Sequence, residues 1–394
     1  MTTITGEIYY IGVNDRRKAL FENMWPLPYG ISYNSYLIVD EKTALIDTVD
    51  RTIMDNFYEN LEEALQGRTL DYLIINHIEP DHSGAIGALL ACYPNMIIVG
   101  NVQTQKILKN YFGEIEHFLP VADDKELALG QHTLKFYTTP WIHWPETMMT
   151  YDTTDGVLFS GDAFGSFRTL DGGIFDDEIA FERDYQDEML RYYSNIVGKY
   201  SNMVQKGLAK LANVAIKAIC STHGPIWRNE PQKVVSLYDQ WSKHEADNGT
   251  VIAFASMYSN TEQVADSIAR ELAEQGMRNI KIYDVSKTHV SFIISEVWKY
   301  KNIILGSCAY NTAMHPMMAQ LCRELAHISP KNKRLGVFGS FSWSGGGVKS
   351  LLQFAENIGW EQPAAAVEIT GKPNAEKLTV CRNFAAAFAQ AVQQ

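Results

Sequence analysis

Four side chains of the kinds that bind metal ions are crowded into six residues behind an apolar segment. They lie in the stretch HIEPDH and are His77, Glu79, Asp81 and His82. In an extended chain, residues two apart point the same way, so we expect His77, Glu79 and Asp81 to converge. Pro80 disfavours the helical conformation at Glu79 and should keep the segment extended, with His82 leaving on the other side. A polar loop that caps a helix is the alternative, but the residue types favour a metal site.

Three later residues could complete such a site. His143 lies in WIHWPETM, Asp162 in LFSGDAFG and His223 in CSTHGPIW. Each follows an apolar or extended run near Gly or Pro, although any one alone could be a structural histidine or a turn aspartate. Together with the first motif they give four imidazoles and three carboxylates. Mixed ligation of this kind suits iron or manganese, and carboxylate-rich dinuclear sites are typically di-iron.

The order and spacing of these residues resemble the metallo-β-lactamase fold, in which such ligands gather at one edge of a β-sandwich. Most hydrolases of that superfamily carry His-x-His-x-Asp-His and bind zinc, whereas this chain has Glu79 at the second histidine. That replacement resembles the flavodiiron proteins, and every position of their ligand pattern is present here. The resemblance implies that one iron is held by His77, Glu79 and His143 and the other by Asp81, His82 and His223, with Asp162 bridging them. Trp144 and Tyr193 are candidates to line the pocket, or are plain core aromatics.

Three segments in the second half of the chain could hold a phosphate-bearing cofactor. The first joins a strand to a helix, where hydroxyls, an amide and free backbone N–H groups could cradle a phosphate. It lacks the glycine and lysine signatures of nucleoside-triphosphate and dinucleotide loops, and taken alone it could be a simple helix cap. The other two follow later strands, so they should meet the first at the carboxyl edge of a doubly wound sheet. The candidate residues are Ser256, Met257, Tyr258, Ser259, Asn260 and Thr261; Ser307, Cys308, Ala309, Tyr310 and Asn311; and Ser340, Phe341, Ser342, Trp343, Ser344 and Gly345.

These segments resemble the flavodoxin-like domains of flavodiiron proteins across Thr250–Gln394, and this resemblance implies FMN as the cofactor. The rings of Tyr310 and Trp343 could flank the isoalloxazine ring. One departure is Cys308, where relatives often have proline. This difference bears on the rigidity of the loop and on the flavin potential that the loop tunes.

The elements that must position these residues differ between the two halves. Up to about Tyr238, short segments rich in β-branched and aromatic residues alternate with turns and helices, as in sheets covered by helices. From about Gly249, apolar strands alternate with helices, as in a parallel doubly wound sheet. We therefore predict an α+β metallo-β-lactamase-like αββα sandwich over residues 1–248 and an α/β flavodoxin-like domain over residues 249–394. The polar stretch 244–250 is the expected linker.

Composition argues against several other classes of protein. A net charge of −12 disfavours binding to nucleic acid or to anionic membranes. The sequence shows neither a secretory signal nor an apolar stretch of membrane-spanning length, so we expect a cytoplasmic protein. The five cysteines are scattered without a Cys-x-x-Cys pair. We therefore expect no disulfide framework and no fused rubredoxin iron site.

The resemblance implies an oxidoreductase that reduces dioxygen to water, nitric oxide to nitrous oxide, or both, at a di-iron site fed by FMN. It also implies a head-to-tail homodimer, or a tetramer built from such dimers. Electrons would come from a separate donor: rubredoxin, a reduced deazaflavin or a flavin reductase, among which the sequence does not choose. Two alternatives remain open, namely a zinc hydrolase of the glyoxalase II type fused to a flavodoxin, and a pure electron carrier.

Overall fold

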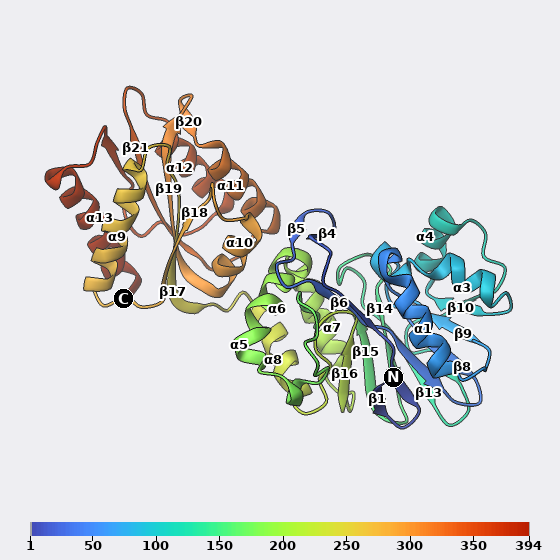
Figure 1. The fold of residues 1–394 in the computed structure, drawn as a ribbon. Helices are drawn as coiled ribbons and strands as arrows, with labels where there is room; N and C mark the ends of the chain where they lie inside the picture. Colours follow the sequence, from blue (N-terminus) through green and yellow to red (C-terminus); the bar gives the residue numbers. More distant parts are fainter. Residues whose placement is uncertain (1, 394) are drawn as a thin grey trace. The chain divides into compact units, whose positions relative to one another are not determined.

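The computed structural model describes residues 2–393, which form two compact units that adjoin in the sequence at Ser242 and Lys243 (Figure 1). The linker in the structure is shorter than the expected stretch 244–250. Strand β17 (Asp247–Ala255) already begins within that stretch, because Asp247 pairs with Tyr300 of the neighbouring strand. The domain boundary expected at residues 248 and 249 stays a prediction.

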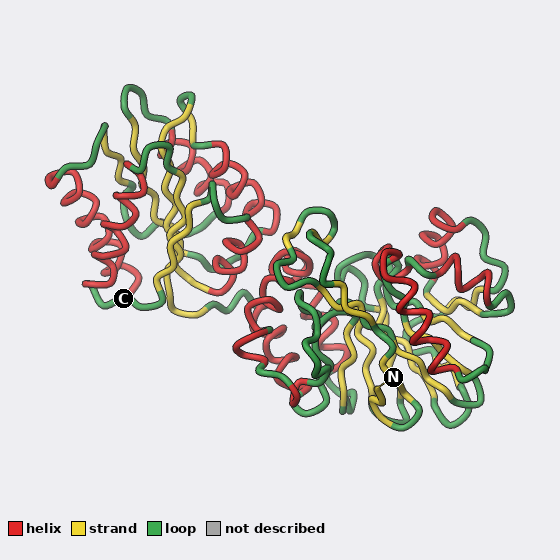
Figure 2. The backbone as a smooth tube through the Cα atoms, viewed as in Figure 1, coloured by secondary structure: helices red, strands yellow, loops and turns green. Residues whose placement is uncertain are grey.

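The first unit contains two stacked sheets with helices outside them (Figures 1 and 2). The larger sheet has the order β1 (Thr2–Thr5), β2 (Ile8–Tyr10), β7 (Tyr36–Val39), β8 (Thr43–Ile46), β9 (Tyr72–Ile74), β10 (Ile97–Gly100) and β11 (Phe118–Pro120). The smaller sheet has the order β12 (Glu126–Ala128), β13 (Thr133–Thr138), β14 (Met148–Asp152), β15 (Val157–Gly161) and β16 (Ala218–Ser221). Their inner faces form one apolar core, in which Ile46 and Val99 of the first sheet pack with Phe136 and Phe159 of the second.

Helices of the first unit flank this sandwich. Those near the larger sheet are α1 (Met54–Leu65), α3 (Ile86–Cys92) and α4 (Val102–Phe112), and those near the smaller sheet are α5 (Phe181–Asp184), α6 (Gln186–Tyr192), α7 (Ser201–Leu211) and α8 (Pro231–Ser242). Helix α1 buries Phe57, Leu61 and Leu65, which recur every four residues along one face. Two further strand pairs, β3 (Val13–Asp15) with β6 (Ile31–Tyr33) and β4 (Leu20–Phe21) with β5 (Trp25–Pro26), stand apart from the main sheets.

The second unit is a parallel sheet covered on both faces. Its strands follow the order β18 (Ile280–Asp284), β17, β19 (Tyr300–Tyr310), β21 (Arg334–Phe341) and β22 (Val367–Thr370). The helices are α9 (Asn260–Glu274), α10 (Val290–Lys299), α11 (Pro316–Ile328), α12 (Gly347–Ile358) and α13 (Ala375–Gln393). Helices α9 and α13 pack together on one face, and α10, α11 and α12 form the other layer (Figure 1). The predicted fold class, a β-lactamase-like sandwich followed by a flavodoxin-like sheet, is confirmed.

None of the helices within residues 2–393 combines the length and the apolar character needed to cross a membrane.

Candidate metal centre and cofactor loops

The seven residues expected to bind metal meet at the ends of four strands. His77 and Glu79 follow β9, His143 follows β13, Asp162 follows β15 and His223 follows β16. The remaining two, Asp81 and His82, lie in the short helix α2 (Pro80–Ser83). All seven side chains are buried, with at most 8 % of any residue exposed. Residues far apart in the sequence therefore form one enclosed polar cluster.

The first group consists of His77, Glu79, His143 and Asp162. The Nε2 atom of His143 lies 3.0 Å from Glu79 Oε2 and 3.1 Å from Asp162 Oδ2. The Nε2 atom of His77 lies 3.1 Å from the same oxygen of Glu79 and 3.6 Å from the same oxygen of Asp162. Two imidazole nitrogens and two carboxylate oxygens thus face one point, in the arrangement that a metal ion requires.

The second group consists of Asp81, His82 and His223. The Nε2 atoms of His82 and His223 each lie 3.3 Å from Asp81 Oδ2. They also approach the other oxygen of Asp162, Oδ1, at 2.9 Å and 3.7 Å. Asp162 therefore stands between the groups and presents one oxygen to each. This division matches the one implied by the family resemblance, and metal ligation by these residues stays a prediction.

The expectation that Asp81 converges with His77 and Glu79 is wrong. Glu79 is extended, with φ −54° and ψ 142°, as its place before a proline predicts. Pro80, however, begins a helical turn at its N1 position, where a proline is well tolerated. The period of two along a strand ends there, so Asp81 points to the second group together with His82.

The outer sides of two of the imidazole rings, those of His77 and His223, are held by partners that sequence reasoning missed. His77 Nδ1 lies 2.7 Å from Glu146 Oε1, and His223 Nδ1 lies 2.7 Å from the Ser32 carbonyl oxygen. A carbonyl can only accept, so His223 must carry its proton on Nδ1, which leaves Nε2 as a lone-pair donor. Such partners fix the ring orientation and the tautomer of metal-binding histidines. Only Glu146 left a signal in the sequence, three residues beyond His143.

Asp162 is held by a further residue that the sequence did not indicate. The Thr222 hydroxyl donates to Asp162 Oδ1 at 2.6 Å. Thr222 directly precedes His223 at the end of β16, so the same strand end supplies one candidate ligand and fixes another. The hydrogen bond orients the carboxylate between the two groups.

Several buried atoms of the second group lack any hydrogen-bond partner within residues 2–393. They are both carboxylate oxygens of Asp81, both ring nitrogens of His82 and the Nε2 atom of His223. Burying polar atoms without partners is costly unless something else satisfies them. The Nε2 atoms of His82 and His223 lie close to Asp81 Oδ2, yet neither contact has the geometry of a hydrogen bond. Such an arrangement is expected of ligand atoms that are directed at a common ion. The residues present therefore fit a metal pair.

The imidazoles and the carboxylates of the cluster stabilise each other's charged forms. Burial alone opposes the charged form of His143, but the hydrogen bonds that it donates to Asp162 and Glu79 raise its pKa to about 9. Burial would likewise raise the pKa of Glu79, yet hydrogen bonds from His143 and His77 hold it below its usual range. Glu79 and Asp162 are thus ionised at neutral pH and attract cations, and a metal ion would displace the imidazole protons.

The two aromatic candidates behave differently. The ring centroid of Trp144 lies 5.2 Å from that of His77, in an edge-on contact, so this tryptophan does line the site. Tyr193 instead lies 3.0 Å from the hydroxyl of Ser201 and packs on Tyr238. Its neighbour Tyr192 lies against the site, with its ring 5.6 Å from that of His223.

A cleft of about 580 Å³ leads to the cluster. It is lined by the hairpin residues 18–23 and by Asp50, Glu79, Pro80 and Asp81. Glu22 of this hairpin accepts a hydrogen bond from Trp25 at 2.9 Å. Burial and the nearby charge of Glu79 raise the pKa of Glu22 to about 7. Glu22 is therefore a carboxyl group in the lining of the cleft that the sequence did not indicate.

In the second unit, the three candidate cofactor segments lie at the carboxyl ends of β17, β19 and β21. Two of them are more regular than expected. Strand β19 extends to Tyr310, because its end pairs with β20 (Ala313–Met314), and β21 extends to Phe341. Ser307 to Tyr310 and Ser340 to Phe341 are therefore strand residues rather than loop residues.

The first segment has the features of an anion cradle. Ser259 occupies the N-cap position of α9 but makes no capping bond with its side chain. The buried hydroxyl of Ser256 has no hydrogen-bond partner among the described residues. The hydroxyls of Thr261 and Ser340 lie 2.9 Å apart and join the first segment to the third. A helix N-terminus with unused hydroxyls fits the phosphate of a bound nucleotide.

Two exposed rings stand beside this cradle. Tyr310 is 43 % and Trp343 is 81 % exposed, which is unusual for rings of this size and leaves them free to stack on a planar ligand. Cys308 lies within β19, where it pairs with Ser340, and burial raises the pKa of its thiol. The remaining candidates of the three segments have no contact here that assigns them a role.

Comparison with known proteins accounts for both units. The family model described as ODP family beta lactamase matches residues 31–224, and the flavodoxin model matches residues 252–384. The anaerobic nitric oxide reductase flavorubredoxin of Aliivibrio fischeri is 33% identical over 388 residues, which cover 96% of this chain and 77% of that protein. The chain belongs to the flavodiiron protein family.

Solved structures of flavodiiron proteins agree with this assignment. The rubredoxin:oxygen oxidoreductase of Desulfovibrio gigas has a TM-score of 0.94 and 30% identity, covering 100% of this chain and 98% of that one. A flavo di-iron protein variant from Thermotoga maritima has a TM-score of 0.89 and 28% identity, covering 97% and 95%. The family resemblance drawn from the sequence is confirmed.

Proposed function

We propose that this chain is an oxidoreductase that reduces dioxygen, nitric oxide or both at a di-iron centre supplied with electrons through FMN. The observation that carries the proposal is the position of Asp162, whose two oxygens face two separate buried groups of ligand-type side chains. The relative from Aliivibrio fischeri is named for nitric oxide reduction and that from Desulfovibrio gigas for oxygen reduction. Both gases are therefore proposed as substrates.

The di-iron centre would be held by the residues already grouped: His77, Glu79 and His143 on one side, Asp81, His82 and His223 on the other, and Asp162 between them. Bound iron would supply redox equivalents and open coordination positions for a small gas. The protein contributes three carboxylates that offset the metal charge, and Glu146 and the Ser32 carbonyl fix the rings. The ligand-type side chains are buried, and the cleft lined by Glu79, Pro80 and Asp81 joins them to solvent.

FMN would be held where the three segments of the second unit meet. Its phosphate would lie at the N-terminus of α9, against the hydroxyls of Ser256 and Thr261. Its ring would lie between Tyr310 and Trp343. Bound FMN would relay electrons from a two-electron or one-electron donor.

We also propose the donor and the assembly. The donor is a separate protein or cofactor, rubredoxin first and a reduced deazaflavin or a flavin reductase as alternatives. The assembly is a head-to-tail homodimer or a dimer of such dimers, and the two domains span residues 1–248 and 249–394. Family resemblance supports these proposals, and a monomer with full turnover would contradict the assembly.

The deciding experiment is anaerobic turnover of protein loaded with iron and FMN, with reduced rubredoxin as the donor. We expect consumption of dioxygen or nitric oxide and two iron ions per chain. His143→Ala should abolish gas consumption while FMN is still reduced by the donor. Two zinc ions per chain with esterase activity would instead establish the hydrolase alternative, and unchanged consumption in the variant would leave an electron carrier.

A further inference from the structure

The turn of residues 221–224, at the end of β16, serves both metal groups. It carries His223 of the second group, and its Thr222 hydroxyl donates to Asp162, the carboxylate that stands between the groups. The pairing of β16 with β15 ends at Ser221, so the carbonyl groups of the turn need partners outside the sheet. Whatever supplies these partners also decides where two candidate ligands point.

One residue satisfies three of the four carbonyl groups of this turn. Asn34 donates through Nδ2 to the carbonyl oxygen of Ser221 at 3.0 Å and to that of Gly224 at 2.8 Å. The backbone N–H of Asn34 donates to the carbonyl oxygen of Thr222 at 2.7 Å. The fourth carbonyl oxygen, that of His223, accepts from the Ser221 hydroxyl within the turn at 2.7 Å.

The chemistry of this position requires an amide side chain. A carbonyl oxygen can only accept, so the two carbonyls that face the side chain of Asn34 both need N–H donors. The other end of the amide is used as well, because Oδ1 accepts from the Tyr10 hydroxyl at 3.2 Å. Asn34 is fully buried, so an aspartate of the same shape would direct a carboxylate at two carbonyl oxygens without water to separate them.

Ser32 holds the other end of the turn. Its hydroxyl oxygen accepts from the backbone N–H of Gly224 at 2.8 Å, and its carbonyl oxygen faces Nδ1 of His223. Between Ser32 and Asn34, the ring of Tyr33 packs against the imidazole of His223, with 5.4 Å between the ring centroids. Residues 32–34 therefore form a seat that contacts the turn along its whole length.

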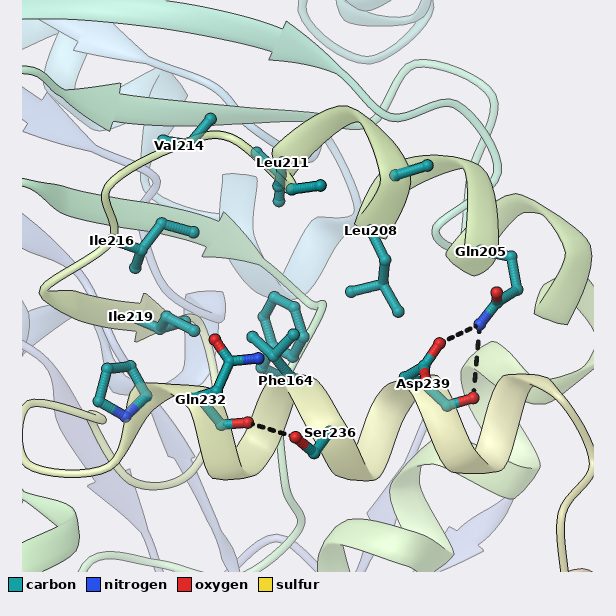
Figure 3. Close-up of a pocket in the computed structure, with 14 residues that line it drawn as sticks. Phe164, Gln205, Leu208, Leu211, Val214, Ile216, Ile219, Gln232, Ser236 and Asp239 are labelled. Atoms are coloured by element: carbon teal, nitrogen blue, oxygen red, sulfur yellow. Dashed lines mark hydrogen bonds between the residues drawn. The ribbon is translucent and has the colours of Figure 1, made fainter.

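The outer face of β16 gives the turn less support. Ala218 and Cys220 belong to the core between the two sheets, whereas Ile219 faces the helices. Together with Phe164, which lies two residues beyond Asp162, Ile219 lines a pocket of about 510 Å³ between α7 and α8 (Figure 3). An open pocket provides fewer packing contacts than a filled core. We therefore expect the hydrogen bonds of the seat, rather than packing, to fix the turn.

We propose that Asn34 is a positioning residue for the metal centre, which sets the metal affinity of the second group by holding the turn of residues 221–224. The proposal rests on the proposed function and adds a residue that controls how one of the two metal positions is filled. The turn supplies His223 to the second group and none of the histidines of the first group. Loss of the seat should therefore empty the second group before the first.

The variant Asn34→Asp tests this role, because it keeps the shape of the side chain and replaces a donor by an acceptor. The measurement is the iron occupancy of each group in crystals of the loaded protein, from anomalous scattering at the iron edge after soaks in graded chelator. We expect the second group to lose iron at a chelator concentration about 10- to 100-fold lower than in the wild type, with a smaller shift in the first group. Ferric iron left in the first group should show the EPR signal of an uncoupled ion.

Two further variants separate positioning from folding. Ser32→Ala keeps the backbone carbonyl that faces His223 and loses only the bond to Gly224, so it should shift the same group by a smaller factor. Asn14→Asp is the matched control, because the amide of Asn14 on the neighbouring strand β3 donates to the carbonyl oxygen of Leu170 at 3.0 Å, away from the candidate metal groups. It should leave both occupancies unchanged.

The outcomes distinguish this role from the proposed function. Equal loss of iron from both groups in Asn34→Asp, or no loss from either, would overturn the proposal. If that variant does not fold, Ser32→Ala decides by the same criterion. Glu146→Gln, which releases the ring of His77, should empty the first group first. A wild type that holds two iron ions and consumes neither gas would overturn the proposed function and leave the role of Asn34 in place.

Discussion

At the scale of single residues, the metal centre depends on atoms that do not face the metal. His77 presents Nε2 to the first group because Glu146 holds Nδ1 from behind, and Glu146 also accepts from the backbone N–H of Ile78 at 3.0 Å. One buried carboxylate thus fixes the orientation of the His77 ring and the position of the backbone that follows it. Such a residue affects metal affinity without touching the metal.

Glu146→Gln should therefore weaken metal binding. We expect metal affinity to fall about 10- to 100-fold, the usual effect of losing such a partner. The measurement is the iron retained after dialysis against graded chelator. The control is Asp40→Asn, which changes a buried carboxylate that accepts from the backbone N–H of His132 at 2.7 Å and belongs to none of the candidate metal groups. Equal iron loss in both variants would show that Glu146 acts only on stability.

Adjacent tyrosines give a second prediction. Tyr193 lies within hydrogen-bond distance of Ser201, so Tyr193→Phe should lower the free energy of unfolding by about 1 kcal/mol. The Tyr192 hydroxyl is buried without a partner among the described residues, so Tyr192→Phe should be neutral or slightly stabilising. Urea unfolding of the two variants measures the difference, and the reverse order would contradict these roles.

The seven candidate ligands could be predicted because histidine and carboxylate at strand ends are visible in the sequence. Their supporting partners could not. Ser32 and His223 are separated by 191 positions, and only the fold brings them together. Tyr192 and Tyr193 have the same residue type, and their directions depend on where α6 ends and the following π-helical turn begins.

At the scale of elements, the sites are shaped by where regular structure stops. Pro80 ends an extended segment and begins a helical turn, which sends Glu79 and Asp81 to different groups. In the second unit, β20 lengthens β19 and holds the turn between them close to the segment after β21. Sequence patterns predicted the elements but not these ends, because pairing partners decide where a strand stops.

The hairpin of β4 and β5 is another feature that sequence patterns did not predict. Its turn contains Glu22 and Asn23, with φ of 49° and 54°. Tight hairpins are usually marked in a sequence by Asn-Gly or Asp-Gly. The sequence Glu22-Asn23 is not one of these turn signals, so neither the hairpin nor the cleft beside it was predicted.

A pair of glycines tests the contact between the cofactor segments. Gly346 has φ +125°, and a Cβ atom there would lie 2.1 Å from the carbonyl oxygen of Thr312. Gly346→Ala should cost about 1–3 kcal/mol in strain and separate the two segments. We expect FMN affinity to fall by about tenfold or more, since about 1.4 kcal/mol corresponds to tenfold.

Flavin fluorescence, measured as FMN is added to the apoprotein, reports this affinity. The control is Gly345→Ala, whose Cβ atom would lie 3.2 Å from the movable carboxylate of Glu368. This variant should lose much less affinity. Equal losses would mean that the contact with Thr312 does not hold the segments together.

At the scale of the whole molecule, each unit has its own core, and the rhythm of strands and helices was enough to predict both architectures. The first core lies between two sheets and the second between a sheet and its helices. What the sequence did not indicate is a buried charge-bearing group in the second unit. Lys333 is only 3 % exposed and donates to the carbonyl oxygens of Trp298 and Tyr300 at 3.0 Å and 2.9 Å.

This lysine should make the stability of the second unit depend on pH. Burial, and then the charge of Lys301, lower the pKa of Lys333 from 10.5 to about 7, while Asp247 acts in the opposite direction. The unfolded chain keeps the proton up to the higher value, so unfolding takes up a proton between these limits. The free energy of unfolding should therefore rise with pH across this window, by at most about 1.4 kcal/mol per pH unit.

Urea unfolding at about pH 7 and about pH 9.5, monitored on the second unit, measures this rise. Lys333→Met should remove it, whatever its effect on stability at any one pH. Lys349→Met, an exposed lysine of α12, should keep it. A rise that persists in Lys333→Met would assign it to other groups.

The place of Asp162 between the two groups has a consequence for how the protein acquires its metals. A first ion held at one oxygen of this carboxylate would orient the other oxygen toward the vacant group. We therefore expect occupation of one group to raise the affinity of the other, which would make loading cooperative. A titration with ferrous iron should then pass from empty to doubly loaded chains with little of the singly loaded species between them.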